Sequence, residues 1–262
     1  MARGRGRPAI SRHHFLSYAE QTHGSRFWIV RYAHERRAAV AAEMILHTKP
    51  AVVIDWGTGD GFVIEGLLDR ADTSLELMIA YEPGVEMARL LRDRLGAHRL
   101  GDRVRVCDTP SAVIEALDGR LIDVFACLGV LEHLPLTTRR VYYRVAAKYL
   151  APEGCLIIDV PVEYGPALLV KELARRFLKG RPPAYPLREL LLRSIGRTTR
   201  DPARFDDTGS TRFITTHRGF DHRHLIDEVS TDYRVVERRN TPVRWAPAWA
   251  FNQEVIFRAV SR

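Results

Sequence analysis

A glycine-rich segment with one preceding acidic residue has the composition of a ligand-binding loop. It comprises Val53-Ile54-Asp55-Trp56-Gly57-Thr58-Gly59-Asp60-Gly61-Phe62 and lies between an apolar run and a helical pattern. Glycines let the chain turn sharply and let a ligand lie against bare backbone, while the amides of a helix N-terminus point toward that ligand. The third glycine of a GxGxxG dinucleotide fingerprint would fall on Phe62, and the Gly-Lys-Ser/Thr of a P-loop is absent. The segment is therefore predicted to bind a different ligand.

Two histidines are candidates for acid–base chemistry. His133 follows an apolar run and His217 precedes an expected helix. Imidazole changes its charge near neutral pH, so either side chain is suited to act as a general base. His133 also has a structural interpretation, in which it forms local hydrogen bonds that hold the Glu132 loop, and both interpretations stay open. Glu163 and Tyr164, directly after another apolar run, complete this group of polar candidates.

Continuous apolar runs alternate with helical patterns over residues 51–160, and these elements must position the candidates. The expected strands are 51–55, 75–82, 104–107, 121–128 and 155–160, and the expected helices are 62–70, 85–95, 111–117 and 137–150. Such alternation predicts a parallel sheet buried by helices on both faces. Asp221 is expected to cap a helix that ends near Ser230, and two last strands, 233–239 and 254–260, are expected to pair antiparallel. The predicted fold class is therefore α/β with three layers.

The acidic residue and GxGxG pattern resemble the first motif of class I S-adenosylmethionine-dependent methyltransferases. Glu82 ends the second expected strand and Asp108 follows the third, where that family places acids near the ribose and the adenine. Gly129-Val130-Leu131-Glu132-His133-Leu134 resembles the Leu-Glu-His-Leu element of its small-molecule branch, which includes quinone-biosynthesis enzymes, and residues 148–158 resemble that branch's helix, Pro-Gly turn and fifth strand. The resemblance implies a Rossmann-like seven-stranded sheet, order 3-2-1-4-5-7-6, with strand seven antiparallel.

The resemblance also implies which residues hold the cofactor, S-adenosylmethionine. They are Asp55, Gly57, Gly59, Gly61, Glu82, Asp108 and Leu128. In this assignment Glu82 accepts both ribose hydroxyls, and Leu128 contacts the methionine end through its backbone. Trp56 replaces the small residue that is usual in this loop, and an aromatic residue there more often packs against the neighbouring helix than stacks on ligand.

The expected reaction is in-line methyl transfer to a small-molecule acceptor, at a hydroxyl of a sugar, a lipid-linked molecule or a quinone-like molecule. Most of the acceleration comes from holding the nucleophile about 3 Å from the methyl carbon. His133, or as second candidate His217, would act as the catalytic base. Leu128 stands where metal-dependent catechol-type enzymes carry a carboxylate, so no metal is expected. The three cysteines lie in apolar runs without a CxxC pair, which excludes a disulfide framework and a zinc ribbon and favours the cytoplasm.

A nucleic-acid-directed methyltransferase or DNA-binding protein is the alternative. Arg5-Gly6-Arg7-Pro8 resembles the minor-groove core of an AT-hook. However, Leu128-Gly129-Val130-Leu131 replaces the Asn/Asp-Pro-Pro-Tyr/Phe element with which exocyclic-amine DNA and RNA methylases bind a flipped base. Cys127 follows Ala126 in an apolar run, so it is not expected to be the nucleophile of a C5-pyrimidine enzyme. A small-molecule acceptor is therefore favoured over nucleic acid.

Basic charge lies outside the motif region. The 262 residues are 46% hydrophobic and 27% charged, as in a globular protein, and the net charge of +8 makes an anionic partner one candidate. Residues 1–40 hold eight arginines against two acids, and residues 163–216 hold 11 bases against six acids. We expect residues 1–33 to form a basic tail and cap helix, and residues 34–262 to form one methyltransferase domain with a basic lid at about 163–216.

The lid segment has two interpretations. Apolar residues of 167–178 share one helical face with charged residues opposite, and residues 187–195 repeat the pattern. A basic amphipathic helix would rest on an anionic membrane, whereas an ordinary lid would pack on the sheet or on a second subunit. Trp245 and Trp249 also have two interpretations, either as anchors at a membrane interface or as core residues. In either case the lid is expected to select the acceptor, and the oligomeric state is not predicted.

Overall fold

The computed structural model describes residues 28–71, 74–179, 184–197, 213–214 and 216–262. The Arg5-Gly6-Arg7-Pro8 sequence and the lid residues 180–183, 198–212 and 215 lie outside these ranges, so the expectations attached to them stay predictions. Within the described ranges, no helix combines the length and the apolar content that a membrane crossing requires.

One mixed sheet forms the centre of the fold. Its strands are β1 (Val52–Trp56), β2 (Leu77–Tyr81), β3 (Val104–Cys107), β4 (Ile122–Leu128), β5 (Leu150–Pro161), β6 (Tyr233–Thr241) and β7 (Glu254–Ser261). Their order is β3-β2-β1-β4-β5-β7-β6, with β7 antiparallel to both neighbours and the other pairs parallel. The predicted fold class and strand order are confirmed. The order reverses between β1 and β4, and the crevice at such a switch point is where open α/β sheets bind ligands.

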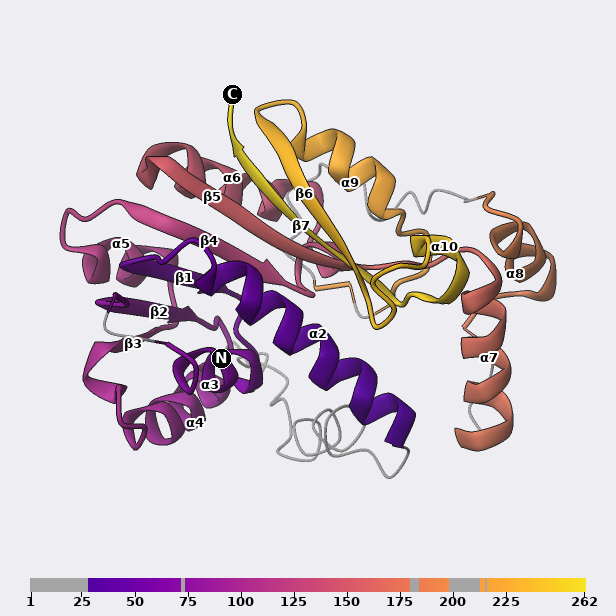
Figure 1. Cartoon of the computed structure of the whole chain (residues 1–262), viewed down its shortest axis with the longest axis horizontal. Coiled ribbons are helices and arrows are strands. Elements are labelled where there is room, and N and C mark those ends of the chain that lie inside the picture. The colour runs from indigo at the N-terminus through magenta and orange to yellow at the C-terminus, as the bar shows by residue number, and fades with distance from the viewer. Residues whose placement is uncertain (1–27, 72–73, 180–183, 198–212, 215) are drawn as a thin grey trace, which may run out of the picture.

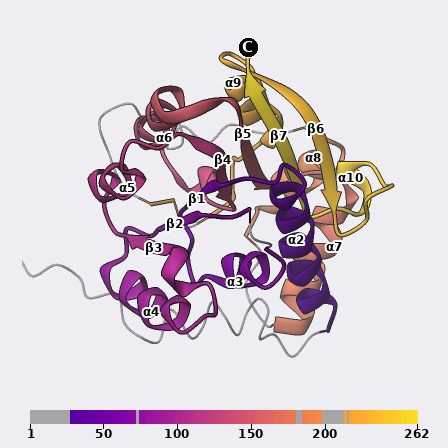
Figure 2. The same cartoon turned by 60° about the vertical axis from the view of Figure 1, so that its left-hand side comes forward.

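Helices cover both faces of the sheet (Figures 1 and 2). One face carries α2 (Trp28–Leu46), α3 (Phe62–Leu68) and α4 (Val85–Gly96), and the other carries α5 (Pro110–Leu117), α6 (Leu136–Tyr149) and α9 (His222–Val229). Successive strand residues point to opposite faces, so β1 places Val53 in the first core and Ile54 in the second. Because both faces are buried, the strands need the continuous apolar runs that predicted them.

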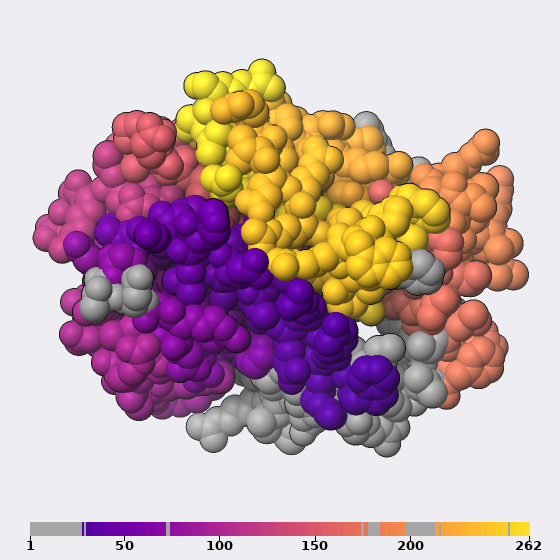
Figure 3. Space-filling model, viewed as in Figure 1, coloured from indigo at the N-terminus to yellow at the C-terminus, as the bar shows by residue number. Residues whose placement is uncertain are grey.

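Helix α2 closes one side of the sheet and contacts α3 and strands β4 to β7. It runs without interruption through residues 33 and 34, where the sequence analysis divides the cap from the domain. Its own residues Val40, Met44 and Ile45 are buried in the core. The space-filling view shows α2, in indigo, along the surface of the molecule (Figure 3). Residues 34–46 therefore belong to the same helix as residues 28–33.

Strand β5 begins earlier than predicted. Leu150 already pairs with Ile122, and the register shifts before Val124 pairs with Cys155. The Pro-Gly turn expected within residues 148–158 is thus an irregularity within the strand. A Cβ atom at Gly154 would lie 2.6 Å from the Ile122 carbonyl oxygen, so the close approach of the two strands requires glycine.

The lid segment forms two helices beyond the end of β5. They are α7 (Pro166–Lys179) and α8 (Leu187–Ser194), and they lie at the end of the molecule that also holds α10 (Ala248–Phe251) (Figures 1 and 3). Leu168 is buried against Tyr185 and Leu190. Val170 and Phe177, however, are 66% and 76% exposed. Among the described residues, much of the apolar face of α7 is therefore exposed, and what this face contacts stays a prediction.

Candidate active site

The glycine loop after β1 adopts a conformation that other residues rarely reach. Gly57, Gly59 and Gly61 have φ values of 87°, 61° and 81°. A Cβ atom at Gly57 would lie 2.6 Å from a methyl group of Val130, whereas a Cβ at Gly59 would meet no atom within 4 Å. The backbone at Gly59 therefore faces open space, as close approach of a ligand requires.

Two acidic residues of the predicted cofactor set follow the strands β2 and β3. One oxygen of Glu82 accepts a hydrogen bond from the Gly59 amide (3.0 Å) and the other accepts one from the Gly84 amide (2.8 Å). Each oxygen keeps a second lone pair for a further donor. Asp108, after β3, is partly exposed and its carboxylate lies 3.2 Å from the Arg92 guanidinium. Both acids therefore lie at the carboxyl ends of their strands, as predicted.

Asp55 is a buried carboxyl group at the end of β1. Burial raises its pKa from 3.8 to about 7. Its Oδ1 atom is buried and has no hydrogen-bond partner among the described residues. Buried polar atoms in native proteins are nearly always paired, so this oxygen points to a donor supplied by a ligand or water.

Trp56 packs inside the protein. Its ring lies 4.2 Å from that of Tyr81 on β2, 5.6 Å from Phe125 on β4 and 6.2 Å from Tyr142 on α6. The residue is 4% exposed. The aromatic residue in the loop thus anchors β1 against α6, as the packing interpretation predicts.

An ionic cluster that the sequence analysis missed lies at the other side of the switch point. The Arg37 guanidinium on α2 contacts the Asp159 carboxylate at the end of β5 and lies 3.0 Å from Glu254 on β7. A Cβ atom at Gly129 would lie 2.4 Å from the same guanidinium. Asp159 is the single acidic residue inside the apolar run 155–160, and this was the sequence feature that could have indicated the cluster. It fixes α2 beside the predicted cofactor contact Leu128, which is buried and pairs with Asp159.

His133 forms the last residue of a short 3-10 helix, η2 (Leu131–His133), after β4. Its Nδ1 atom lies 2.6 Å from the carbonyl oxygen of Ile214, and its own carbonyl accepts the Ile214 amide at 2.8 Å. The ring also stacks on Phe213, with 4.7 Å between centroids. These contacts join the ring to residues 213 and 214 and not to the Glu132 loop, so whether His133 is catalytic or structural stays a prediction.

The fold brings His217 against His133, although 84 residues separate them. The two Nε2 atoms lie 3.3 Å apart. His217 Nδ1 lies 3.0 Å from Oε1 of Glu163, which follows β5. Both predicted catalytic histidines and Glu163 therefore form one connected group at the ends of β4 and β5, whereas Tyr164 stacks on His222 instead.

Glu163 is a buried carboxylate that forms an ion pair with Lys171. Lys171 Nζ lies 2.6 Å from Oε1, and the Tyr185 hydroxyl donates to Oε2 at 2.7 Å. Burial alone would raise the pKa of Glu163, but the Lys171 ammonium and His217 outweigh burial and hold that pKa far below its usual value. Lys171 and Tyr185 carry no motif in the sequence, so only the folded lid reveals their role.

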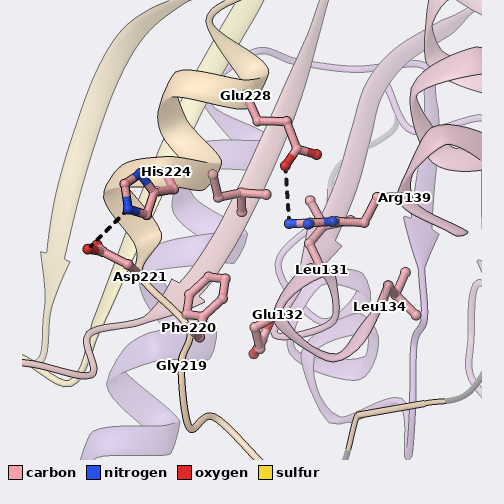
Figure 4. Close-up of a pocket in the computed structure, with 10 residues that line it drawn as sticks. Leu131, Glu132, Leu134, Arg139, Gly219, Phe220, Asp221, His224 and Glu228 are labelled. Atoms are coloured by element: carbon pink, nitrogen blue, oxygen red, sulfur yellow. Dashed lines mark ion pairs between the residues drawn. The ribbon is translucent and has the colours of Figure 1, made fainter. Parts of the chain in front are cut away.

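A cavity of about 60 Å³ borders Glu132 of η2 and lies between η2, α6 and α9 (Figure 4). It is lined by Leu131, Glu132, Leu134, Arg139, Gly219, Phe220, Asp221, His224, Leu225 and Glu228. Arg139 and Glu228 form an ion pair of 3.2 Å at its wall. Such a volume holds a few water molecules but not a methyl acceptor. Glu132 is 3% exposed there, and burial raises its pKa to about 8.

No family model and no curated protein matches the sequence, but solved structures match the fold. The CcbJ methyltransferase from Streptomyces caelestis is 16% identical, with 87% of this chain and 89% of that chain covered, at a TM-score of 0.55. The 1,6-didemethyltoxoflavin-N1-methyltransferase of Burkholderia thailandensis is 19% identical, with 98% and 93% covered, at a TM-score of 0.52. The small RNA methyltransferase HEN1 is 15% identical, with 90% of this chain and 26% of that chain covered, at a TM-score of 0.57. These likenesses establish that the chain has the fold of the S-adenosylmethionine-dependent methyltransferases.

Proposed function

We propose that this protein is an S-adenosylmethionine-dependent methyltransferase that modifies a small molecule at a hydroxyl group. The observation that carries the proposal is the loop at the switch point, where three left-handed glycines border the buried Asp55 and the Gly59 amide donates a hydrogen bond to Glu82. Proteins of the same fold support it, since the toxoflavin methyltransferase holds S-adenosylhomocysteine and its small-molecule substrate. Residues 34–262 would act as one cytoplasmic domain of the small-molecule, Leu-Glu-His-Leu type.

The residues present fit this cofactor. The backbone at Gly59 faces open space, Asp55 offers a buried oxygen that needs a donor, and Glu82 keeps lone pairs for the ribose hydroxyls. Asp108 would lie near the adenine and Leu128 near the methionine end. When bound, S-adenosylmethionine supplies a methyl group on a sulfonium.

The histidine pair lies where an acceptor hydroxyl would be deprotonated. Nδ1 of His133 is held by a carbonyl oxygen and Nδ1 of His217 by a carboxylate, so Nε2 is the atom of each ring that would take the proton. Glu163 orients His217, and Lys171 and Tyr185 hold Glu163 in place. The acceptor would thus be held by the loop after β4 and by the lid.

The test separates cofactor binding from turnover. Glu82→Ala should weaken S-adenosylmethionine binding measured by calorimetry by about 10- to 100-fold, since bonds to a charged group contribute about 1.5–3 kcal/mol. Glu86→Ala, an exposed acid on the adjacent helix, is the matched control and should bind normally. Unchanged affinity in Glu82→Ala would remove that residue from the site, and a wild-type protein that binds no cofactor would refute the proposed function.

His217→Ala should lower turnover and leave S-adenosylmethionine binding unchanged. Loss of a general base lowers turnover by about 10²- to 10⁴-fold, while cofactor affinity stays normal because His217 lies outside the glycine loop. The acceptor is first identified by incubating metabolite extracts with methyl-labelled S-adenosylmethionine. A variant with normal turnover would show that positioning alone suffices.

Nucleic-acid methylation is the second candidate, because HEN1 shares the fold and its printed name gives small RNA as its substrate. The basic sequence Arg5-Gly6-Arg7-Pro8 would supply phosphate contacts. Salt-dependent binding of RNA or DNA that is lost on deleting residues 1–10 would favour this candidate over a small molecule.

A further inference from the structure

We propose that Glu132, His133 and His217 bind a divalent transition-metal ion, with Zn²⁺ as the probe of choice. One ligand atom from each residue lies within 4.8 Å of the other two. The sequence predicted no metal because it lacks the carboxylate of catechol-type enzymes after β4. The present site instead joins two adjacent residues of η2 to a histidine 84 positions later.

The hydrogen bonds fix which nitrogen of each ring carries the proton. Nδ1 of His133 lies 2.6 Å from the Ile214 carbonyl oxygen, which only accepts, so this Nδ1 donates. Nδ1 of His217 lies 3.0 Å from Oε1 of Glu163, an oxygen that already accepts from Lys171 Nζ. An ionised carboxylate also only accepts. In both neutral rings Nε2 is therefore the atom with the lone pair.

These two lone pairs face each other at 3.3 Å. Two acceptors at that distance repel each other unless a cation or a shared proton lies between them. Zn–N bonds of about 2.0–2.1 Å at a tetrahedral angle place two ligand nitrogens about 3.3 Å apart. The observed separation matches the spacing that a tetrahedral ion imposes on two histidines.

Glu132 supplies the third ligand. Its Oε1 lies 3.8 Å from His133 Nε2, within a small rotation of the ligand separation of a tetrahedral site. The carboxylate is buried, so a nearby cation would offset the cost of ionising it there. Two histidines and one carboxylate leave a coordination position open, as catalytic metal sites do.

The surroundings also fit a metal site. Ligating histidines nearly always donate their second N–H to a carbonyl or carboxylate, which fixes the ring and its tautomer. Ile214 and Glu163 play these parts, and the Tyr185 hydroxyl in turn holds Glu163. If the proposed methyl transfer is correct, an acceptor hydroxyl at the open position would be polarised by the ion and would release its proton to solvent, and His133 and His217 would then act as ligands and not as the base.

The test titrates Zn²⁺, and Co²⁺ as a spectroscopic probe, into the full chain after treatment with a chelator and its removal. We expect one ion per chain with an affinity in the micromolar range or tighter, and Co²⁺ absorption typical of four or five ligands. His133→Ala and His217→Ala should weaken binding at least about 100-fold, and Glu163→Gln about 10- to 100-fold. His98→Ala, whose ring pairs with Asp69, is the matched control and should bind normally.

Two results would overturn the proposal. One is wild-type protein that takes up neither metal, with the two rings titrating as a pair that shares one proton. The other is His217→Ala with unchanged affinity and a normal far-ultraviolet circular dichroism spectrum. Calorimetry with S-adenosylmethionine on the metal-free protein is a separate measurement, so failure of the metal site and failure of the proposed methyltransferase function are distinguishable.

Discussion

Protonation of Asp55 links the candidate site to the folding stability of the protein. Its folded-state pKa is about 7 against 3.8 for an exposed carboxyl, so between these values the folded chain holds a proton that the unfolded chain has released. Folding is therefore favoured most below about pH 4, and the contribution is lost as pH rises toward 7. Above that range the protein carries the cost of a buried charge, which natural proteins accept mainly at functional sites.

Asp55→Asn should remove this cost. At pH 8 the free energy of unfolding in urea should rise by an amount of the order of 2–4 kcal/mol relative to wild type, and at pH 4 the two proteins should differ little. The amide keeps the shape of the carboxyl but does not ionise. An Asn variant with the same pH dependence as wild type would show that Asp55 is solvated or paired in solution.

At this scale the sequence predicted residues that a local motif specifies. The three glycines and Glu82 lie within one strand–loop–helix–strand unit, and their spacing alone places them together. The contacts of His217 with His133 and Glu163 depend on the ends of β4 and β5 and on the loop before α9, so no spacing reveals them. Helix α9 offers a similar lesson. His222 is buried within it, and burial lowers its pKa to about 4, although its position in the pattern gave no sign of this.

Among the elements, the buried strands were predicted best and the boundaries least well. A strand with both faces covered must be mostly apolar, so β1, β2 and β4 follow from composition, whereas β3 at the sheet edge exposes Arg105. The early start of β5 depends on a register shift opposite Ile122, which is decided by the neighbouring strand. Helix α2 depends in the same way on tertiary partners, because Arg37 ties it to β5 and β7.

Arg37→Met tests whether this ion cluster holds α2 in place. Above about pH 8, where Glu254 is ionised, the change should lower the free energy of unfolding by about 3–5 kcal/mol, because removing one partner leaves buried carboxylates without a countercharge. The loss should shrink at lower pH, since burial raises the pKa of Glu254 to about 8 and that of Asp159 above its ordinary value, and both become neutral.

Arg36→Met is the matched control on the same helix, because the described residues show no ion pair for Arg36. It should unfold within about 0.5 kcal/mol of wild type, as surface substitutions usually do. A loss below about 1 kcal/mol for Arg37→Met would mean that α2 is held by its apolar face alone.

At the scale of the whole molecule, several large apolar side chains are exposed at one end of the structure. Val170, Phe177, Leu187, Ile195, Trp245 and Trp249 are each more than half exposed, and they belong to α7, to α8 with the residue that follows it, or to the segment around α10. These elements lie at one end of the molecule (Figure 1). We call this the α7–α10 surface. An anionic membrane stays a predicted partner of this surface, because exposed basic residues such as Arg176 lie on the same helices.

Removing two exposed apolar side chains of the α7–α10 surface should weaken such membrane contact without affecting the fold. Wild-type protein is expected to sediment with phosphatidylglycerol vesicles at low salt, and Val170→Ser with Phe177→Ser should weaken this at least about tenfold, because each buried apolar side chain contributes about 1.5–3 kcal/mol. Val85→Ser with Leu90→Ser, exposed apolar residues on α4, is the matched control and should sediment like wild type. Both variants should unfold within about 0.5 kcal/mol of wild type. Wild-type protein that ignores vesicles but sediments as a dimer that the first variant disrupts would assign the surface to a second copy of the chain.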